Sequence, residues 1–262
     1  MMNVNLNLLK KSPPYPFIIA FCIGMALPTY AQNQNDSIVV ITNSALLKKR
    51  PFLKQLIVPA SLIAGGVLLN RRQFEKSVNK NVIFTVGPNF KTNIDDYLRY
   101  APIAEIYVGD ALGLKAKNHW FDQTKNLAIS IIVTDFITAK IKKLSQKTRP
   151  NGAATAHSFP SSHSSFAFTN ATVLYEEFKD SSPAFAYSGY GFAAATGSLR
   201  LMNNAHWLSD VMVGAAIGIV VTKVVYLLDP IIKWNPFKHT DGFVVLPNVD
   251  SEGYGLYIAR RF

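Results

Sequence analysis

Cysteine and acidic side chains are both scarce in this chain. Its single cysteine, Cys22, cannot form a disulfide within the chain, and it also excludes a zinc site built from several cysteines. The 16 Asp and Glu residues are outnumbered by 27 Lys and Arg residues, which gives a formal net charge of +11. A surface this basic favours anionic partners, such as lipid headgroups, nucleic acids or phosphorylated substrates.

Charged residues as a whole are also sparse, while apolar residues are abundant. Charged residues make up 16% of the chain, below the roughly 25% that is typical of soluble domains. Apolar residues make up 49%, which excludes an intrinsically disordered chain. The 262 residues are enough for one large domain or two small ones.

The N-terminus has the three regions of an export signal. Two lysines precede an apolar run over residues 17–27, which is too short to cross a bilayer as a helix. Small residues then follow at Thr29 and Ala31, the two positions that a signal peptidase reads. We predict a signal peptide over residues 1–31 and an N-terminal extension over 32–51. The alternative is an uncleaved anchor.

Six later stretches are predicted to be helices because they are long, rich in Ala, Leu and Ile, and separated by Pro, Gly, Asn or Asp. They cover residues 52–69, 101–114, 127–143, 164–178, 184–200 and 208–228. The sequence therefore predicts an all-α bundle of about six helices within a domain over residues 52–235. Small and branched residues at helical spacing favour close packing of the last helix against a neighbour. These residues are Val211, Gly214, Ala215, Gly218, Ile219 and Thr222.

The C-terminal tail, residues 236–262, differs in composition from the helical part. Residues that favour β-structure occur at 243–246 and 254–258, and they flank the turn-forming segments Pro247-Asn248 and Ser251-Glu252-Gly253. This pattern predicts a short β-hairpin.

The first of three polar segments ends the third predicted helix. Pro150 disfavours helical geometry for Arg149, so we expect the helix to end before Arg149 and its guanidinium to lie at the C-terminal end of the helix. Lys142 lies about two helical turns earlier, and its stem is long enough to reach the same point. Taken alone, this segment is typical of a basic helix end in solvent.

The second segment, Ser158-Phe159-Pro160-Ser161-Ser162-His163, opens the fourth predicted helix. Pro and Ser are favoured at helix starts, where free backbone amides and the helix dipole make an anion site. Ser161 and Ser162 are therefore candidates for binding an anion, with His163 beside it in the first turn. The alternative is an ordinary serine cap followed by a solvent-facing histidine.

The third segment joins the fifth and sixth predicted helices and contains Arg200, His206 and Asp210. If the last helix begins near Ala205, His206 and Asp210 lie four residues apart on one face. A carboxylate on one imidazole nitrogen fixes the tautomer and leaves the other nitrogen free as a nucleophile or base. An isolated His/Asp pair is more often a plain hydrogen bond, so the neighbouring segments decide its interpretation.

Together the three segments supply the groups that phosphoryl transfer needs. The two arginines and Lys142 can bind the equatorial phosphate oxygens. One neutral histidine can attack phosphorus in line, while a protonated second histidine supplies the leaving-group proton. This scheme requires no metal and no cofactor. A zinc site formed by His157, His163 and His206 is the alternative, but its spacing matches no familiar zinc site.

The three segments resemble, in the same order, the signature of the type 2 phosphatidic acid phosphatase superfamily. The motifs of that family are Lys-x6-Arg-Pro, Pro-Ser-Gly-His and Ser-Arg-x5-His-x3-Asp. The residues that match them are Lys142, Arg149 and Pro150, then Pro160, Ser161 and His163, then Arg200, His206 and Asp210. Ser162 replaces the usual Gly but can still donate its backbone amide. Leu199 replaces the usual Ser and removes a hydroxyl donor.

The resemblance covers about residues 100–228 and implies an all-helical, metal-independent phosphatase. It implies a phosphohistidine intermediate on His206, orientation of this side chain by Asp210, and His163 as the acid and then the base. The family also includes soluble exported acid phosphatases and vanadium haloperoxidases, although the haloperoxidases are generally much longer. A non-catalytic envelope protein is a further alternative, against which the complete set of polar residues argues.

The basic charge, the export signal and the apolar helices suggest a lipid-linked phosphate as substrate. The candidates are lipid A, a prenyl diphosphate carrier and phosphatidic acid. We expect such a lipid or another phosphate ester, together with the membrane surface, as partners, and no nucleic acid. An export signal would place the mature N-terminus outside the inner membrane. A periplasmic site therefore requires zero or two membrane spans among residues 52–69, 101–114 and 127–143. The 101–114 stretch fits a span least well, because it is charged. The expected location is the periplasmic side of the envelope, membrane-associated or partly integral.

Overall fold

The computed structural model describes residues 52–153, 157–232, 235, 243–250 and 253–260. The predicted signal peptide over 1–31 and the extension over 32–51 lie outside these residues.

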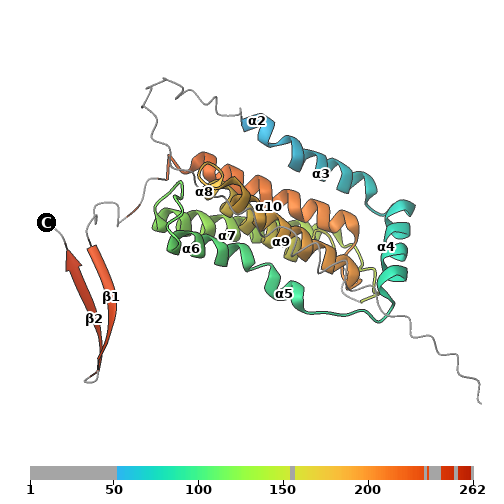
Figure 1. Cartoon of the computed structure of the whole chain (residues 1–262). Coiled ribbons are helices and arrows are strands. Elements are labelled where there is room, and N and C mark those ends of the chain that lie inside the picture. The colour runs from blue at the N-terminus through green and yellow to red at the C-terminus, as the bar shows by residue number, and fades with distance from the viewer. Residues whose placement is uncertain (1–51, 154–156, 233–234, 236–242, 251–252, 261–262) are drawn as a thin grey trace, which may run out of the picture. The chain divides into compact units, whose positions relative to one another are not determined.

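The described part of the chain is helical except for one C-terminal hairpin (Figure 1). In chain order its nine helices are α2 (Phe52–Gln55), α3 (Ile57–Leu69), α4 (Gln73–Val86), α5 (Ile94–Leu98), α6 (Ala101–Ala111), α7 (Trp120–Ser145), α8 (Ser162–Phe178), α9 (Pro183–Met202) and α10 (Leu208–Leu228). Strands β1 (Phe243–Asp250) and β2 (Gly253–Arg260) pair in antiparallel register, with Phe243 opposite Arg260 and Asp250 opposite Gly253.

All six predicted helices are present, so the all-α prediction is confirmed. The stretch predicted over 52–69 is divided into α2 and α3, and α10 has the predicted bounds. The predicted C-terminal hairpin is also present. Two helices were not predicted, α4 and α5. The sequence of α4 alternates apolar with charged and amide residues, and α5 has only five residues, so neither contains a long apolar run.

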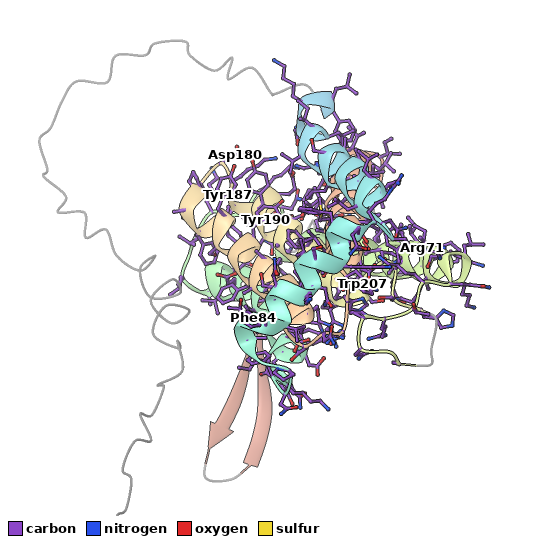
Figure 2. The ribbon with its side chains drawn as sticks, turned by 90° about the vertical axis from the view of Figure 1, so that its right-hand side faces the viewer. Arg71, Phe84, Asp180, Tyr187, Tyr190 and Trp207 are labelled. Carbon is purple, nitrogen blue, oxygen red and sulfur yellow. The ribbon has the colours of Figure 1, made fainter. Side chains whose placement is uncertain are left out.

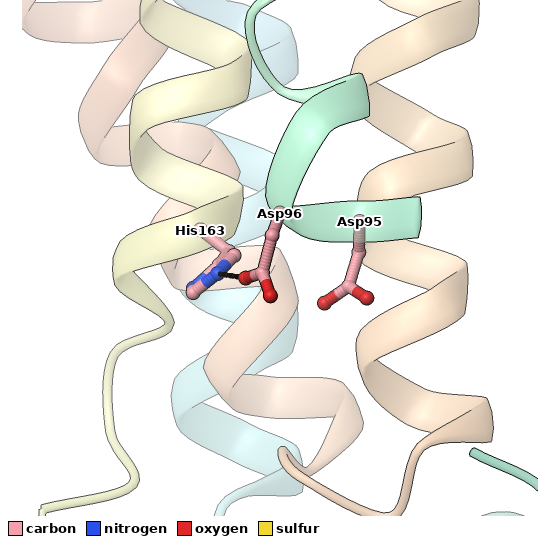
Figure 3. Close-up of side chains that lie close together, drawn as sticks. All are labelled: Asp95, Asp96 and His163. Carbon is pink, nitrogen blue, oxygen red and sulfur yellow. Dashed lines mark hydrogen bonds and ion pairs between the residues drawn. The ribbon is translucent and has the colours of Figure 1, made fainter. Parts of the chain in front are cut away.

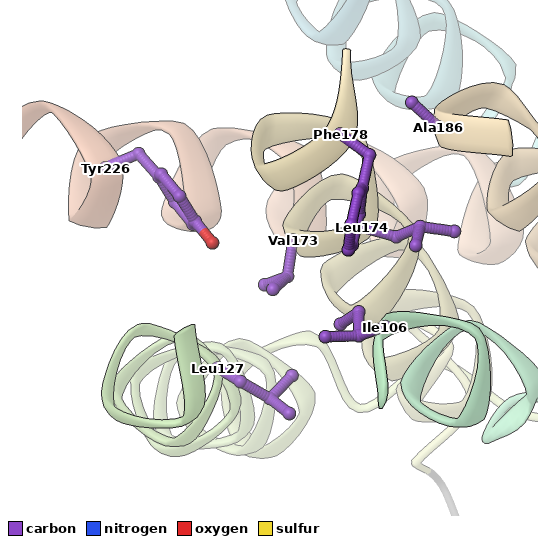
Figure 4. Packing of buried hydrophobic residues seen from close by; sticks show 7 residues of the cluster. All are labelled: Ile106, Leu127, Val173, Leu174, Phe178, Ala186 and Tyr226. Atoms are coloured by element: carbon purple, nitrogen blue, oxygen red, sulfur yellow. The ribbon is translucent and has the colours of Figure 1, made fainter. Parts of the chain in front are cut away.

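Helix α8 lies at the centre of the bundle and packs against α6, α7, α9 and α10, while α3 lies along α10 (Figure 1). The largest apolar cluster is built around Leu174 and Phe178 of α8 (Figure 4). Side chains from four neighbouring helices complete it, namely Ile106, Leu127, Ala186 and Tyr226. Burial of these side chains holds α8 in place, and with it the polar segment that precedes α8.

Helices α8 and α10 approach so closely that two glycines of α10 leave no room for a side chain. A Cβ atom added to Gly214 would lie 2.6 Å from the carbonyl oxygen of Ser161. A Cβ atom added to Gly218 would lie 2.4 Å from the carbonyl oxygen of Ser165. The predicted close packing of the last helix is therefore confirmed, and it joins the second polar segment to the third.

In the described residues, α10 is the one helix that is long and apolar enough to cross a membrane. Within its most apolar window, 67% of the residues are buried inside the bundle. This burial fits the core helix of a soluble protein as well as it fits a membrane span.

Gly218→Ala is expected to destabilise the fold by about 1–3 kcal/mol, because its methyl group would meet the backbone of α8 and force the two helices apart. Gly191→Ala is the matched control. This glycine is exposed on α9 with no atom within 4 Å of an added Cβ, so alanine should leave stability unchanged or raise it by up to about 1 kcal/mol. Thermal unfolding followed by circular dichroism measures both. Equal melting temperatures for the two variants would contradict the close contact.

Candidate active site

Hydrogen bonds to the backbone tie the three polar segments together. Lys142, in the last turn of α7, donates from Nζ to the carbonyl oxygens of His157 (3.0 Å) and Pro160 (2.8 Å). The backbone amide of Ser161 donates to the carbonyl oxygen of Asp210 at 2.9 Å. The first segment therefore contacts the second, and the second contacts the third, as the sequence predicts.

His206 is buried at this junction, with 2% of its surface exposed. Its Nδ1 lies 3.4 Å from Oδ2 of Asp210 and 3.5 Å from the hydroxyl of Ser158. All its side-chain hydrogen bonds to described residues run through Nδ1, which leaves Nε2 for a reacting group. Burial lowers the pKa of His206 to about 4, although Asp210 opposes this effect. At neutral pH the imidazole is therefore uncharged, the form that a nucleophile requires.

Asp210 has the contacts of an ionised carboxylate. It is the third residue of α10, and its Oδ2 accepts hydrogen bonds from the backbone amide of Trp207 (2.9 Å) and from the hydroxyl of Ser158. Lys147 donates to Oδ1. Burial raises the pKa of Asp210, but the hydrogen bond from His206, the charge of Lys147 and the bonds from Ser158 and Trp207 together hold this pKa below its ordinary value.

One expected detail of this pair is wrong. Helix α10 begins at Leu208, so His206 precedes the helix and does not lie on its face. The contact forms because the side chain of Asp210 reaches back over the helix N-terminus, where it also caps the amide of Trp207. A carboxylate in this position interacts favourably with the helix dipole.

Three cationic side chains lie at the junction. Arg149 follows α7, as expected, and its Nη1 lies 3.5 Å from the carbonyl oxygen of Ala205. Arg200, in the last turn of α9, has a buried Nε without a hydrogen-bond partner among the described residues. Burial, together with the charges of Arg149 and Arg200, lowers the pKa of Lys142 to about 8. These cations therefore repel one another, and an anion bound between them would relieve the repulsion.

Ser161 has a different position from the one expected of a phosphate ligand. Its hydroxyl caps α8 by accepting a hydrogen bond from the amide of Ser164 at 3.3 Å, and its own amide is bound to Asp210. The backbone amide of Ser161 is thus committed to the fold, and its hydroxyl accepts from Ser164. Helix α8 begins at Ser162, so the amides of its first turn that can donate to an anion are those of Ser162 and His163.

Two carboxylates of α5 enter the site, and the sequence analysis missed both (Figure 3). Asp95 is buried, forms an ion pair with Arg200 and accepts a hydrogen bond from the side-chain amide of Asn203 at 3.0 Å. Asp96 is about half exposed, and its Oδ1 lies 2.7 Å from Nε2 of His163. Burial, helped by the charges of Arg200 and Arg99, lowers the pKa of His163, while the hydrogen bond to Asp96 opposes the shift.

The same carboxylates form, with His163, the one group among the described residues that could hold a metal ion. Their donor atoms lie within 4.8 Å of one another. However, Asp95 is already paired with Arg200, and Asp96 is hydrogen-bonded to His163, so both carboxylates already have protein partners. The zinc set considered from the sequence is not this group, because this group includes neither His157 nor His206.

The sequence analysis did not assign three further side chains of the site. Lys147 and Ser158 contact Asp210, and Glu75 contacts Lys147. Ser158 and Lys147 lie inside the predicted segments, but their contacts depend on how the loops fold back. Glu75 is on α4, a helix that the analysis did not predict. Its burial gives no local signal in the sequence, since an isolated glutamate near a helix start normally faces solvent.

Three comparisons with known proteins are informative. Residues 123–234 match the model of the PAP2 superfamily. A lipid A 1-phosphatase of Porphyromonas gingivalis is 32% identical over 181 residues, which are 69% of this chain and 39% of that protein. The chain thus spans about two-fifths of the length of this relative. The crystal structure of Aquifex aeolicus LpxE aligns with a TM-score of 0.46 and 18% identity, over 61% of this chain and 98% of that one.

Inorganic phosphate is expected to bind at the three cations and to raise the melting temperature as its concentration rises. At one hundred times Kd the stabilisation would be about 2.7 kcal/mol. Arg200→Gln removes one charged donor and should weaken phosphate binding roughly 10- to 100-fold. Differential scanning fluorimetry measures both effects, with Lys143→Met at an exposed position as the control. The same phosphate response in both variants would argue against an anion site at Arg200.

Proposed function

Residues 123–234 match the model of the PAP2 superfamily, and from this match we propose that the chain belongs to that superfamily and is a metal-independent phosphatase of the cell envelope. It removes phosphate from a lipid-linked phosphomonoester or diphosphate. One observation carries the proposal: a buried, neutral His206 is bonded through Nδ1 to Asp210, and the positive charges of Arg200 and Lys142 act on its imidazole.

The proposed reaction has two steps. Nε2 of His206 attacks phosphorus in line, so the N–P bond forms while the bond from phosphorus to the leaving oxygen breaks. His163 donates a proton to that oxygen. In the second step His163 takes a proton from water, the water oxygen attacks phosphorus, and the N–P bond breaks to release phosphate. Asp210 stabilises the positive charge on His206 during both steps.

The cations and the start of α8 hold the transferred group. Lys142, Arg149 and Arg200 bind the equatorial oxygens, where their hydrogen bonds strengthen as charge develops. The backbone amide of Ser162 is proposed as a further donor, because it lies in the first turn of α8. Asp96 favours the protonated form of His163, which the acid role requires, and a bound phosphate dianion would favour that form further.

His206→Ala is expected to lower turnover by a factor of about 10³ or more, because it removes the nucleophile. Turnover by the wild-type enzyme should be unchanged by a chelator. The assay uses p-nitrophenyl phosphate. Parallel assays with lipid A and with a prenyl diphosphate as substrates identify the preferred class of substrate. His119→Asn is the control, since Asn can still cap the start of α7. Full activity of His206→Ala would exclude the proposed chemistry.

The pH profile of kcat/KM is expected to have an acidic optimum. Activity should rise through about pH 4, where His206 loses its proton and becomes nucleophilic. It should fall again as His163 loses its proton, which happens below the ordinary histidine pKa of about 6.5 because burial lowers the pKa of His163. Steady-state assays between pH 3 and pH 9 check this order. A maximum above pH 8 would contradict the assigned roles.

A phosphate on lipid A is the first candidate substrate, and the membrane surface is the proposed partner. The name of the Porphyromonas gingivalis relative supports the first point. Exposed apolar side chains support the second. Phe84 on α4 is 89% exposed and projects from the surface (Figure 2), and Leu144 is 84% exposed at the same end of α7 as Lys142. Apolar side chains next to lysines suit the interface of an anionic membrane.

The site is proposed to face the periplasm, with the chain membrane-associated or partly integral. A reporter enzyme that works only after export, fused after Pro150, should be active in cells. A reporter that works only in the cytoplasm should be inactive at the same position. Activity of the cytoplasmic reporter alone would contradict this location.

A further inference from the structure

A buried chain of ion pairs connects the catalytic junction to α4. We propose that Lys147, held in place by Glu75, fixes the charge and orientation of Asp210 and so acts as a positioning residue for His206. This inference rests on the function proposed above. Glu75 lies outside the residues that match the family model, so this part of the site is a contribution of the preceding chain.

Lys147 lies between two carboxylates. Its Nζ is 3.0 Å from Oδ1 of Asp210, and 3.1 Å and 3.0 Å from the two oxygens of Glu75. It also donates to the hydroxyl of Ser209 at 2.8 Å. All three charged side chains are buried: 5% of Lys147, 1% of Glu75 and none of Asp210 is exposed. Without water to solvate them, each charge depends on its protein partners.

Glu75 is itself held by contacts that do not involve Lys147. The backbone amides of Arg71 and Ser209 each donate to its carboxylate at 3.0 Å, and the hydroxyl of Ser209 donates as well. Its position is therefore fixed by the start of α4 and by the second residue of α10. A carboxylate with this many donors is held in one orientation and forms a rigid support for the ammonium group.

The two oxygens of Asp210 have separate partners. Oδ1 faces Lys147, while Oδ2 faces His206, Ser158 and the amide of Trp207. Because Lys147 holds one oxygen, the carboxylate cannot rotate away from the imidazole. This division explains how Asp210 keeps its orientation while the charge on His206 changes during the reaction.

Of the charged groups of this chain, Asp210 acts on His206 directly, and the charges of Arg200 and Lys142 act on it as well. Removing the positive charge of Lys147 would leave Asp210 more negative toward the imidazole and would favour its protonation. Removing the negative charge of Glu75 would have the opposite effect. If Lys147 and Glu75 only linked α4 to α10, removing their charges would not shift the pKa of His206 in opposite directions.

The test compares Lys147→Met with Glu75→Gln, with Lys143→Met as the exposed control. The readouts are the kcat/KM profile on p-nitrophenyl phosphate and an NMR titration of the His206 ring, assigned by its loss in His206→Ala. In Lys147→Met the acid limb should move to higher pH by about one pH unit, with kcat at least about tenfold lower. In Glu75→Gln the acid limb should move to lower pH, and in Lys143→Met it should not move.

If Lys147→Met fails to fold, the nearly isosteric Glu75→Gln still tests the inference. Lys147→Arg keeps the positive charge and should recover most of kcat. An unmoved acid limb in Glu75→Gln, or movement in the same direction in both charge-removing variants, would overturn the inference. If the wild-type protein shows no turnover, the proposed function fails, and the NMR titration still decides whether the buried chain sets the protonation of His206.

Discussion

The buried carboxylate of Asp210 is the group on which the candidate site depends. It is excluded from water, so every charge and hydrogen bond that stabilises it must come from the protein. Its donors come from the loop before α8, from the loop before α10 and from the segment after α7. The hydrogen bonds to this one side chain therefore bring together parts of the chain that are distant in sequence.

The packing of α8 against α10 supplies the complementary backbone constraint. Gly214 and Gly218 allow the two helices to touch along their backbones, and the carbonyl oxygen of Asp210 accepts the amide of Ser161 at the end of this contact. The helix pair that forms the core of the fold is thus the same pair that aligns two of the three polar segments. Stability and site geometry share one interface.

Most of the helices and the meeting of the three segments could be predicted from the sequence, because apolar runs, Pro150 and the serine-rich start of α8 are local signals. The rest could not. Helices α4 and α5 lack long apolar runs, and their acidic residues acquire meaning only through distant partners: Glu75 contacts Ser209, and Asp95 contacts Arg200. Pairings over more than a hundred residues leave no periodic pattern in one sequence.

The pairing of Arg200 with Asp95 has a consequence for which anions can enter. An incoming ion meets an arginine that already has a carboxylate partner, and a histidine that shares its proton with Asp96. The carboxylates of α5 therefore offset part of the positive charge at this end of the bundle. What attracts an anion there depends less on net charge than on directional donors, such as the Nε of Arg200, which has no partner among the described residues.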